Sequence, residues 1–254
     1  YEVIPCHDGR PVGFGPHLER MQNGLDAIEI DYRLDHDEWR GIANRLIELN
    51  GGGNLALYFH VSRGADNKRD HAYPEGVWPT VFAFASEIPP APVPDKSRAV
   101  TFSVVTAEDL RWHRCNSKST SLLGNVMLYQ RGKAVGHDVT LGCDARGELT
   151  EAAACNVYVV KNGIVATPAL DEQKLPGVTR RILLQILRED GSIPVEERVV
   201  TLEELREADE VWLTSSSKEV IPVVAVDDVP VADGNVGDIW LAAQTLYSAR
   251  KFDF

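Results

Sequence analysis

Three short polar segments have the composition of anion-binding sites. A Leu-Pro-Gly segment at 175–177 leads into a predicted helix, so the backbone N–H groups of Val178 and Thr179 would be free donors at its positive end. A Thr-Ser-Ser-Ser segment at 214–217 offers hydroxyls and amides where a strand ends. The loop 63–71 concentrates basic side chains in an acidic protein, namely Arg63, Lys68, Arg69 and His71. Taken singly, these segments can be an ordinary helix cap, a surface turn and a charged loop. Taken together, they indicate binding sites for a phosphate and a carboxylate.

Lys118 and Glu151 could do covalent and electrostatic chemistry. Lys118 lies in a polar stretch before an apolar helix. A lysine amine attacks a carbonyl only when it is uncharged, which requires desolvation or a neighbouring cation. Arg111 and Arg114 are close in sequence and could lower the pKa of Lys118. Glu151 is either an ordinary carboxylate at the end of a strand or helix, or the partner of a buried cation, and a surface position is equally open for Lys118.

Composition and charge exclude several classes of protein. The 254 residues carry 26 Lys and Arg against 38 Asp and Glu, a net charge of −12. This disfavours nucleic-acid and anionic-membrane surfaces, because phosphate backbones and headgroups need clustered basic residues. No apolar stretch reaches the roughly 20 residues of a membrane helix. Four widely spaced cysteines match neither a disulfide scaffold nor a zinc site. We therefore expect a reduced, cytoplasmic protein without a metal, and further residues before Tyr1, where the sequence opens in mid-strand.

The first part of the chain mixes hairpins and helices. Residues 1–6 and 11–14 are predicted strands joined by an Asp-Gly turn. A helix follows from residue 16, and a second begins after Asp35, whose spacing to Glu38 matches a capping box.

Strands and a proline-rich segment follow. Residues 55–62 and 80–85 are predicted as buried strands. Residues 88–95 are the most proline-rich stretch of the chain, which is typical of a linker. We therefore expect a small N-terminal α+β domain at residues 1–88, a linker at 89–97, and a larger C-terminal α+β domain at 98–254 that carries Lys118.

The C-terminal part is also α+β, since its strands form hairpins between helices instead of a regular βαβ array. The absence of G-x-G-x-x-G after a strand argues against a Rossmann cofactor site. The predicted elements are a strand at 99–105, a helix at 122–135, a hairpin turning at Asn162-Gly163, a helix at 178–189, a short helix capped by Thr201 and Glu204, a strand at 210–214, a hairpin turning at 227–228 and a helix at 236–249.

At this point the chain resembles the fold-type IV pyridoxal-phosphate enzymes, which include D-amino-acid and branched-chain aminotransferases and aminodeoxychorismate lyase. The likeness spans essentially the whole chain and rests on segments in a fixed order around Lys118, Glu151, Leu175 and Trp212. Arg69-Asp70-His71 is most similar to the D-amino-acid aminotransferases. The resemblance implies a two-domain enzyme with the cofactor in the interdomain cleft. The implied reaction moves an amino group from a D-amino acid, such as D-alanine or D-glutamate, to 2-oxoglutarate or pyruvate.

The resemblance also implies a role for each matched residue. Lys118 would form a Schiff base with the cofactor aldehyde and later move the substrate proton, while Glu151 would keep the pyridine nitrogen protonated. Leu175 would lie against the ring. The cofactor phosphate would be bound by Arg20, Val178, Thr179, Ser215 and Ser216. The substrate carboxylate would be held by Tyr1, Arg69 and His71.

Alternatives from other classes and reactions stay open. The nearest are aminodeoxychorismate lyase and a transaminase for branched-chain L-amino acids or (R)-amines, and a remote one is a non-catalytic binder of the cofactor or a metabolite. Residues 152–155 are Ala-Ala-Ala-Cys, where D-specific members have a run of serines, so hydroxyls on that side of the cofactor are missing. The resemblance further implies a homodimer, small-molecule substrates, and no nucleic-acid or membrane partner.

Overall fold

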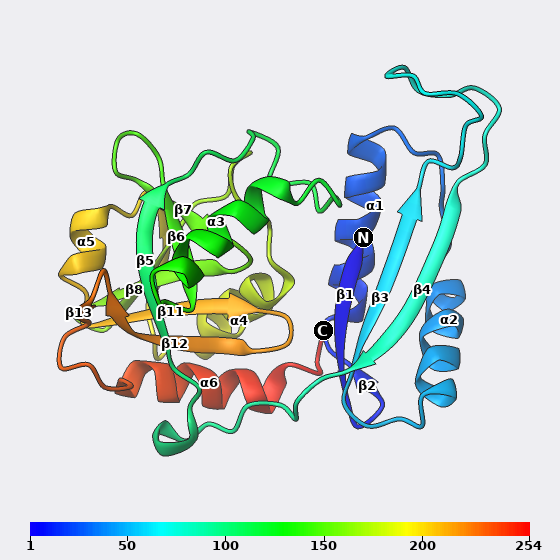
Figure 1. Ribbon diagram of the computed structural model, residues 1–254. Coiled ribbons are helices and arrows are strands. Elements are labelled where there is room, and N and C mark those ends of the chain that lie inside the picture. Colours follow the sequence, from blue (N-terminus) through cyan, green and yellow to red (C-terminus); the bar gives the residue numbers. More distant parts are fainter. The chain divides into compact units, whose positions relative to one another are not determined.

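The computed structural model describes residues 1–254, and the chain forms two compact units (Figure 1). The first unit comprises Tyr1–Pro90, Ser117–Thr120 and Phe254. The second comprises Ala91–Asn116 and Ser121–Asp253. The tetrapeptide around Lys118 therefore packs with the first unit, whereas the sequence analysis assigned it to the C-terminal domain. No helix is both long and apolar enough to cross a membrane.

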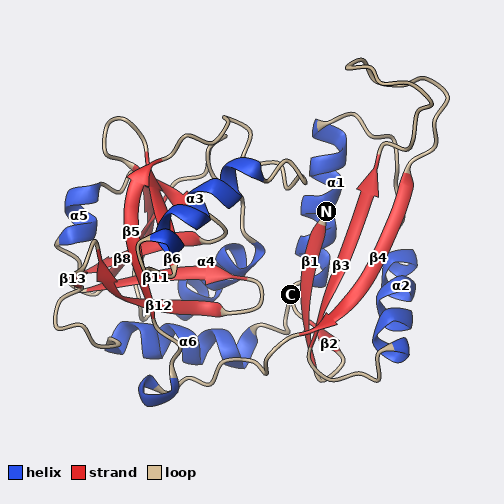
Figure 2. Ribbon diagram, in the orientation of Figure 1, coloured by secondary structure: helices blue, strands red, loops and turns tan.

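The first unit is a four-stranded antiparallel sheet with two helices packed on one face (Figure 2). The strand order is β2-β1-β3-β4. The apolar face of the sheet meets the helices in one core, and the other face carries stacked aromatic side chains. The elements are β1 (Glu2–His7), β2 (Arg10–Pro11), α1 (Phe14–Ala27), α2 (His36–Leu49), β3 (Leu55–Ser62) and β4 (Thr80–Glu87).

Local signals in this unit are partly confirmed. Asp35 accepts hydrogen bonds from the backbone of Glu38, whose carboxylate accepts from the backbone of Asp35, so the predicted capping box is present. The predicted hairpin is present, since β2 pairs antiparallel with β1, but its second strand ends at Pro11 instead of 14, because Gly13 takes a left-handed conformation (φ 62°) and α1 begins at Phe14. The prediction that 80–85 is a buried strand is wrong about burial, since β4 is an edge strand with alternating exposed residues.

The second unit is a nine-stranded mixed sheet in the order β10-β9-β8-β11-β12-β5-β6-β7, with β13 beside β12. Helices α4 and α6 pack on each other and on β11 and β12, and α3 packs on β6 (Figure 2). Both units therefore confirm the α+β class. The elements are η1 (Lys96–Arg98), β5 (Phe102–Glu108), α3 (Leu123–Ala134), β6 (Val139–Cys143), β7 (Leu149–Ala152), β8 (Asn156–Lys161), β9 (Ile164–Pro168), α4 (Val178–Asp190), β10 (Val195–Arg198), α5 (Leu202–Arg206), β11 (Glu210–Ser215), β12 (Glu219–Val226), β13 (Val229–Pro230) and α6 (Asp238–Arg250).

The hairpin and capping signals of the second unit are confirmed. β8 and β9 pair antiparallel around Asn162-Gly163, where Asn162 has the positive φ of 52° that a tight turn requires. Thr201 and Glu204 form a second capping box at the start of α5. The strand expected at 99–105 begins later, at Phe102. The strands β6, β7 and β10 were not anticipated.

A buried charge network fixes the turn between β11 and β12, which carries Ser215 and Ser216. Glu219 follows this turn and has a positive φ of 54°. Its carboxylate accepts a hydrogen bond from Gln244 Nε2 at 2.7 Å and pairs with Lys251, both from the α6 end of the unit. All three side chains are buried. Because the ion pair is closed off from water, removing one charge leaves the other buried without a partner, which is destabilising.

We predict that Lys251→Met lowers the free energy of unfolding by about 3 kcal/mol, because it leaves the Glu219 carboxylate buried without a cation. Urea denaturation followed by far-ultraviolet circular dichroism measures this loss. The double variant Glu219→Gln/Lys251→Met should regain most of it. Lys133→Met, which removes a half-exposed cation 3.6 Å from Asp138, should cost less than about 0.5 kcal/mol. Equal losses in Lys251→Met and Lys133→Met would contradict the analysis.

Candidate active site

Tyr1 and Lys118 form one group of the predicted site residues, in the first unit. The backbone nitrogen of Tyr1 donates to the Lys118 carbonyl at 3.1 Å. Lys118 Nζ donates to the Tyr1 hydroxyl at 3.4 Å and lies 4.4 Å from the centre of the Tyr1 ring. Burial, with Tyr58 and Glu2 nearby, raises the pKa of the Tyr1 phenol, so the hydroxyl stays neutral. The amine is therefore held against an aromatic face and a neutral hydroxyl.

Arg20 is oriented by a buried carboxylate on β1. Glu2 accepts from Arg20 Nε at 2.7 Å and Nη2 at 2.5 Å, and from His17 Nδ1 at 2.7 Å. Burial alone would raise the pKa of Glu2, but the Arg20 charge and the hydrogen bonds from Arg20 and His17 lower it to about 2. The Nε and Nη2 edge of the guanidinium is thus committed to Glu2, which fixes the orientation of Arg20.

Arg69 and His71 lie on the exposed loop between β3 and β4, which extends beyond the ends of both strands (Figure 1). Asp70 between them accepts from the backbone N–H groups of His71 at 2.7 Å and Ala72 at 3.3 Å. This turn presents both side chains to solvent. Tyr1 and Lys118 are joined by hydrogen bonds, whereas Arg69 and His71 are exposed to solvent on this loop.

Glu151 on β7 is the centre of a second group, in the second unit. It is buried, and its Oε1 accepts from Arg111 Nη1 at 2.8 Å. Its Oε2 accepts from Asn156 Nδ2 at 3.1 Å and from the Leu175 backbone N–H at 2.9 Å. Burial raises the pKa of Glu151 to about 7, although the Arg111 charge works against the rise. The interpretation of Glu151 as the partner of a buried cation therefore fits its surroundings.

Asn156 ties Glu151 to the predicted anion site at α4. Its amide also donates to the Leu175 carbonyl at 2.9 Å. A side chain at Gly177 would meet Asn156 Oδ1 at 2.1 Å, so only glycine lets the segment before α4 lie this close. Leu175 is thereby placed between the carboxylate and the start of the helix.

The start of α4 offers free backbone donors, as predicted from the sequence. The Arg181 N–H donates to the Gly177 carbonyl, so the N–H groups of Val178 and Thr179 precede the first intrahelical bond. The Thr179 hydroxyl interacts with the buried Tyr247 phenol, which leaves its backbone as the donor. Ser215 at the end of β11 has a buried hydroxyl, beside the Cys155 thiol, without an oxygen or nitrogen partner.

Sequence reasoning missed two residues of this group. Asn156 carried no signal beyond following Glu151 in the chain. Arg111 was considered only as a cation that could lower the pKa of Lys118, whereas its guanidinium bonds to Asp109 and Glu151. The 40 residues between Arg111 and Glu151 hide this pairing from any local pattern.

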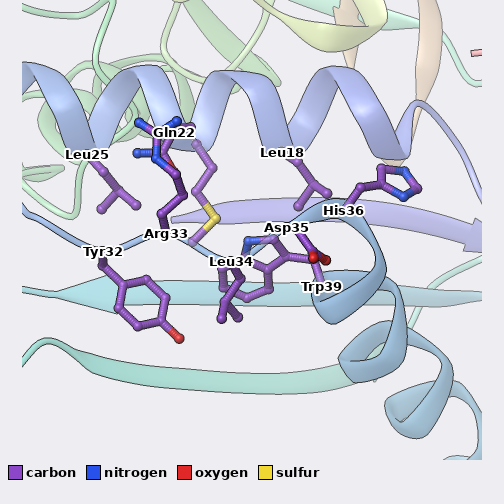
Figure 3. Close-up of a pocket in the computed structure, with 10 residues that line it drawn as sticks. Leu18, Gln22, Leu25, Tyr32, Arg33, Leu34, Asp35, His36 and Trp39 are labelled. Atoms are coloured by element: carbon purple, nitrogen blue, oxygen red, sulfur yellow. The ribbon is translucent and has the colours of Figure 1, made fainter.

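The first unit also contains a hollow of about 320 Å³ between α1, the segment before α2, and α2 (Figure 3). Its lining includes the apolar side chains of Leu18, Met21 and Trp39 and the polar side chains of Gln22 and Arg33. None of the predicted site residues lines it. The chemistry of the site is therefore sought in the two groups described above.

Comparisons with known proteins identify the family of the chain. The family model for class IV amino-transferases matches residues 1–226. The D-alanine aminotransferases of Listeria monocytogenes and Bacillus licheniformis are 34% and 35% identical to the chain, over 94% and 96% of it and 82% and 84% of their own lengths.

Solved structures share the fold. A branched-chain amino acid aminotransferase from Thermobaculum terrenum, in its PLP form, has a TM-score of 0.87 at 19% identity, over 99% of this chain and 83% of its own. A fold IV-transaminase from Curtobacterium pusillum has a TM-score of 0.80 at 25% identity, over 100% of this chain and 85% of its own. The chain therefore belongs to the class IV aminotransferases of fold type IV, a family of pyridoxal-phosphate enzymes.

Proposed function

We propose that the chain transfers amino groups between D-amino acids and 2-oxo acids with pyridoxal phosphate. The observation that carries this proposal is the likeness to D-alanine aminotransferases over 94% of the chain. The motif Arg69-Asp70-His71 supports it, because it is similar to the motif of the D-amino-acid aminotransferases. These residues are exposed to solvent. D-alanine and D-glutamate are the donors, and 2-oxoglutarate and pyruvate the acceptors.

The residues of the second unit fit the cofactor. Glu151 offers a buried carboxylate for a protonated ring nitrogen, and three of its roughly four acceptor positions are already occupied. The free N–H groups at the start of α4 suit a phosphate. The buried Ser215 hydroxyl at the end of β11, and Ser216 in the turn that follows, are further groups proposed to bind the phosphate. When bound, pyridoxal phosphate accepts the electrons that remain when a proton leaves the α-carbon of an attached amino acid.

The first unit supplies the amine and an anion contact. Lys118 would hold the cofactor through its aldehyde and would take up and return the α-proton of the substrate. The Tyr1 hydroxyl, 3.4 Å from Lys118 Nζ, would orient the amine. Arg20, oriented by Glu2, would contact the phosphate.

Arg69 and His71, with Tyr1, hold the substrate carboxylate. A guanidinium binds a carboxylate through two parallel hydrogen bonds, which fixes the direction in which the α-hydrogen points. The D-enantiomer is the one whose α-hydrogen then faces Lys118. A cytoplasmic location is part of the proposal, and the four free thiols support it.

The first test is the visible absorption of the protein loaded with pyridoxal phosphate. D-alanine should collapse the visible band and L-alanine should leave it unchanged. Lys118→Ala should lose the band and slow D-alanine transamination by at least about 10³-fold, because the covalent anchor and the proton carrier are the same amine. Lys161→Ala, which removes a half-exposed lysine at the end of β8, should behave like the parent protein.

Three results would change the proposal. A band that answers to neither enantiomer favours the lyase reaction or a substrate without a carboxylate. A band that answers to L-amino acids favours a branched-chain type of specificity. An unchanged band together with full activity in Lys118→Ala would remove Lys118 from the site.

We predict that Arg69→Ala raises the KM for D-alanine by roughly 10- to 100-fold, the worth of a charge-assisted hydrogen bond to a carboxylate. The KM for a primary amine without a carboxylate should stay within about twofold. Lys68→Ala removes the neighbouring exposed cation, which lies 3.4 Å from Asp70, and should affect neither substrate. Steady-state kinetics with both substrates measures this, and parallel losses would show that Arg69 does not bind the carboxylate.

A homodimer completes the proposal. Helix α3 exposes apolar side chains along one side, including Leu123, Val126 and Met127, with Met127 two-thirds exposed at 66%. Exposed apolar patches of this kind are typical of protein–protein contacts. A second copy of the chain is the occupant that the family resemblance implies.

We predict that Met127→Glu weakens dimerisation by about 30-fold or more, because it places a charge at the centre of a desolvated apolar contact. Analytical ultracentrifugation over a range of protein concentrations measures the dimer dissociation constant. Thr245→Glu adds the same charge to the exposed side of α6 and should leave the constant unchanged. A parent protein that is monomeric at micromolar concentration would refute the dimer.

A further inference from the structure

We propose that Arg111 is a positioning residue: it holds Glu151 in the ionised form and directs the carboxylate at the ring nitrogen of the cofactor. It does so within a buried chain of three charges formed by Asp109, Arg111 and Glu151. The inference rests on the proposed function, because it concerns how that function's carboxylate is kept charged.

The guanidinium of Arg111 is almost fully committed to this chain of charges. Its Nε and Nη2 donate to the two oxygens of Asp109 at 3.0 and 2.7 Å. Its Nη1 donates to Glu151 Oε1 at 2.8 Å, and Nη2 also reaches the Gln173 carbonyl at 3.3 Å. The paired fork on Asp109 leaves the plane of the guanidinium no freedom to turn, so the direction of Nη1 fixes the position of Glu151.

The buried chain of charges is one positive charge short of neutrality. The side chains of Asp109 and Arg111 are 3% exposed and that of Glu151 is 6% exposed, so water screens none of them well. Two carboxylates share one guanidinium, which leaves a net charge of −1. A protonated ring nitrogen beside Glu151 supplies the missing charge, since one acceptor position of the carboxylate is unoccupied.

Asp109 is itself held in place. It accepts from the Thr150 hydroxyl at 2.6 Å and from the Arg111 backbone N–H at 3.0 Å. A side chain at Gly142 would meet Thr150 Oγ1 at 2.7 Å, so glycine permits this approach. Asp109 is thus held rigidly, and Arg111, which donates to both carboxylates, fixes the position of Glu151 on β7 relative to Asp109.

The protonation of the groups agrees with this order. Burial raises the pKa of Asp109, but the bonds from Arg111 and Thr150 more than offset this and hold it below its usual value. For Glu151, burial prevails and the pKa is about 7, with Arg111 the main influence against the rise and Asp109 adding to it. The other titratable neighbours are the thiols of Cys115 and Cys155, whose pKa values burial raises. Arg111 is therefore the cation that keeps Glu151 ionisable near neutral pH.

The test is the protonation of the ring nitrogen itself, followed by nuclear magnetic resonance of protein loaded with pyridoxal phosphate carrying ¹⁵N in the ring. In the parent protein the nitrogen should be protonated at pH 7.5. In Arg111→Met the midpoint of its titration should fall by about one to three pH units, because Glu151 takes up a proton once its cation is gone. Arg111→Lys keeps the charge and loses the fork, and should fall in between.

The control variants separate this role from general damage. In Glu151→Gln the nitrogen should be unprotonated, and adding Arg111→Met to Glu151→Gln should change nothing further. Arg180→Met removes another buried guanidinium, paired with Glu197 at 2.6 Å, and should leave the nitrogen protonated. A purely structural Arg111 would leave the titration unchanged in every variant that retains Glu151.

Each outcome decides the inference. If Arg111→Met does not fold, the position of Arg111→Lys between the parent and Glu151→Gln decides instead, and a titration identical to the parent's overturns the inference. A parent protein that binds no pyridoxal phosphate overturns the proposed function. A parent protein that binds it with a protonated nitrogen, together with unshifted Arg111 variants, overturns the inference alone.

Discussion

Burying a carboxylate away from water is the constraint on which both groups of site residues depend. An ionised carboxylate in the interior needs cations and hydrogen-bond donors, or it takes up a proton. In the first unit, Glu2 accepts hydrogen bonds from Arg20 and His17, and its pKa is lowered to about 2. The second unit answers with Glu151, which shares Arg111 with Asp109, and its pKa rises to about 7. Of these two carboxylates, only Glu151 still lacks a full compensating positive charge.

This difference separates a structural carboxylate from one suited to a ligand. Glu2 fixes the direction of Arg20 and has nothing to gain from another cation. Glu151 retains both an unoccupied acceptor position and an uncompensated charge. The close approaches at Gly142 and Gly177 bring its donors together, since a β-carbon at either would strike Thr150 or Asn156. The absence of a side chain at Gly142 and Gly177 is therefore required for Thr150 and Asn156 to keep their positions.

Features determined by a few neighbouring residues could be predicted from the sequence. Both capping boxes, the Asn162-Gly163 turn and the free donors at the start of α4 are of this kind. Features determined by partners far along the chain could not. The fully buried run Val139–Cys143 lacks the alternation that marks a half-buried strand, so β6 was missed. The burial predicted for residues 80–85 is wrong because β4 is an edge strand whose Val81, Ala83 and Ala85 face the core, whereas Phe82 and Phe84 on its other face are exposed.

The same limit applies to the site. Lys118 and Glu151 are predicted site residues because each lies in a segment that resembles the family in its order of residues. The partner of Arg111 could not, since proximity in sequence pointed to Lys118, seven positions away, and the fold pairs it across 40 residues with Glu151. A cation that seemed suited to lowering the pKa of an amine is instead neutralised by two carboxylates. Lys118 instead contacts the Tyr1 ring and hydroxyl in the first unit.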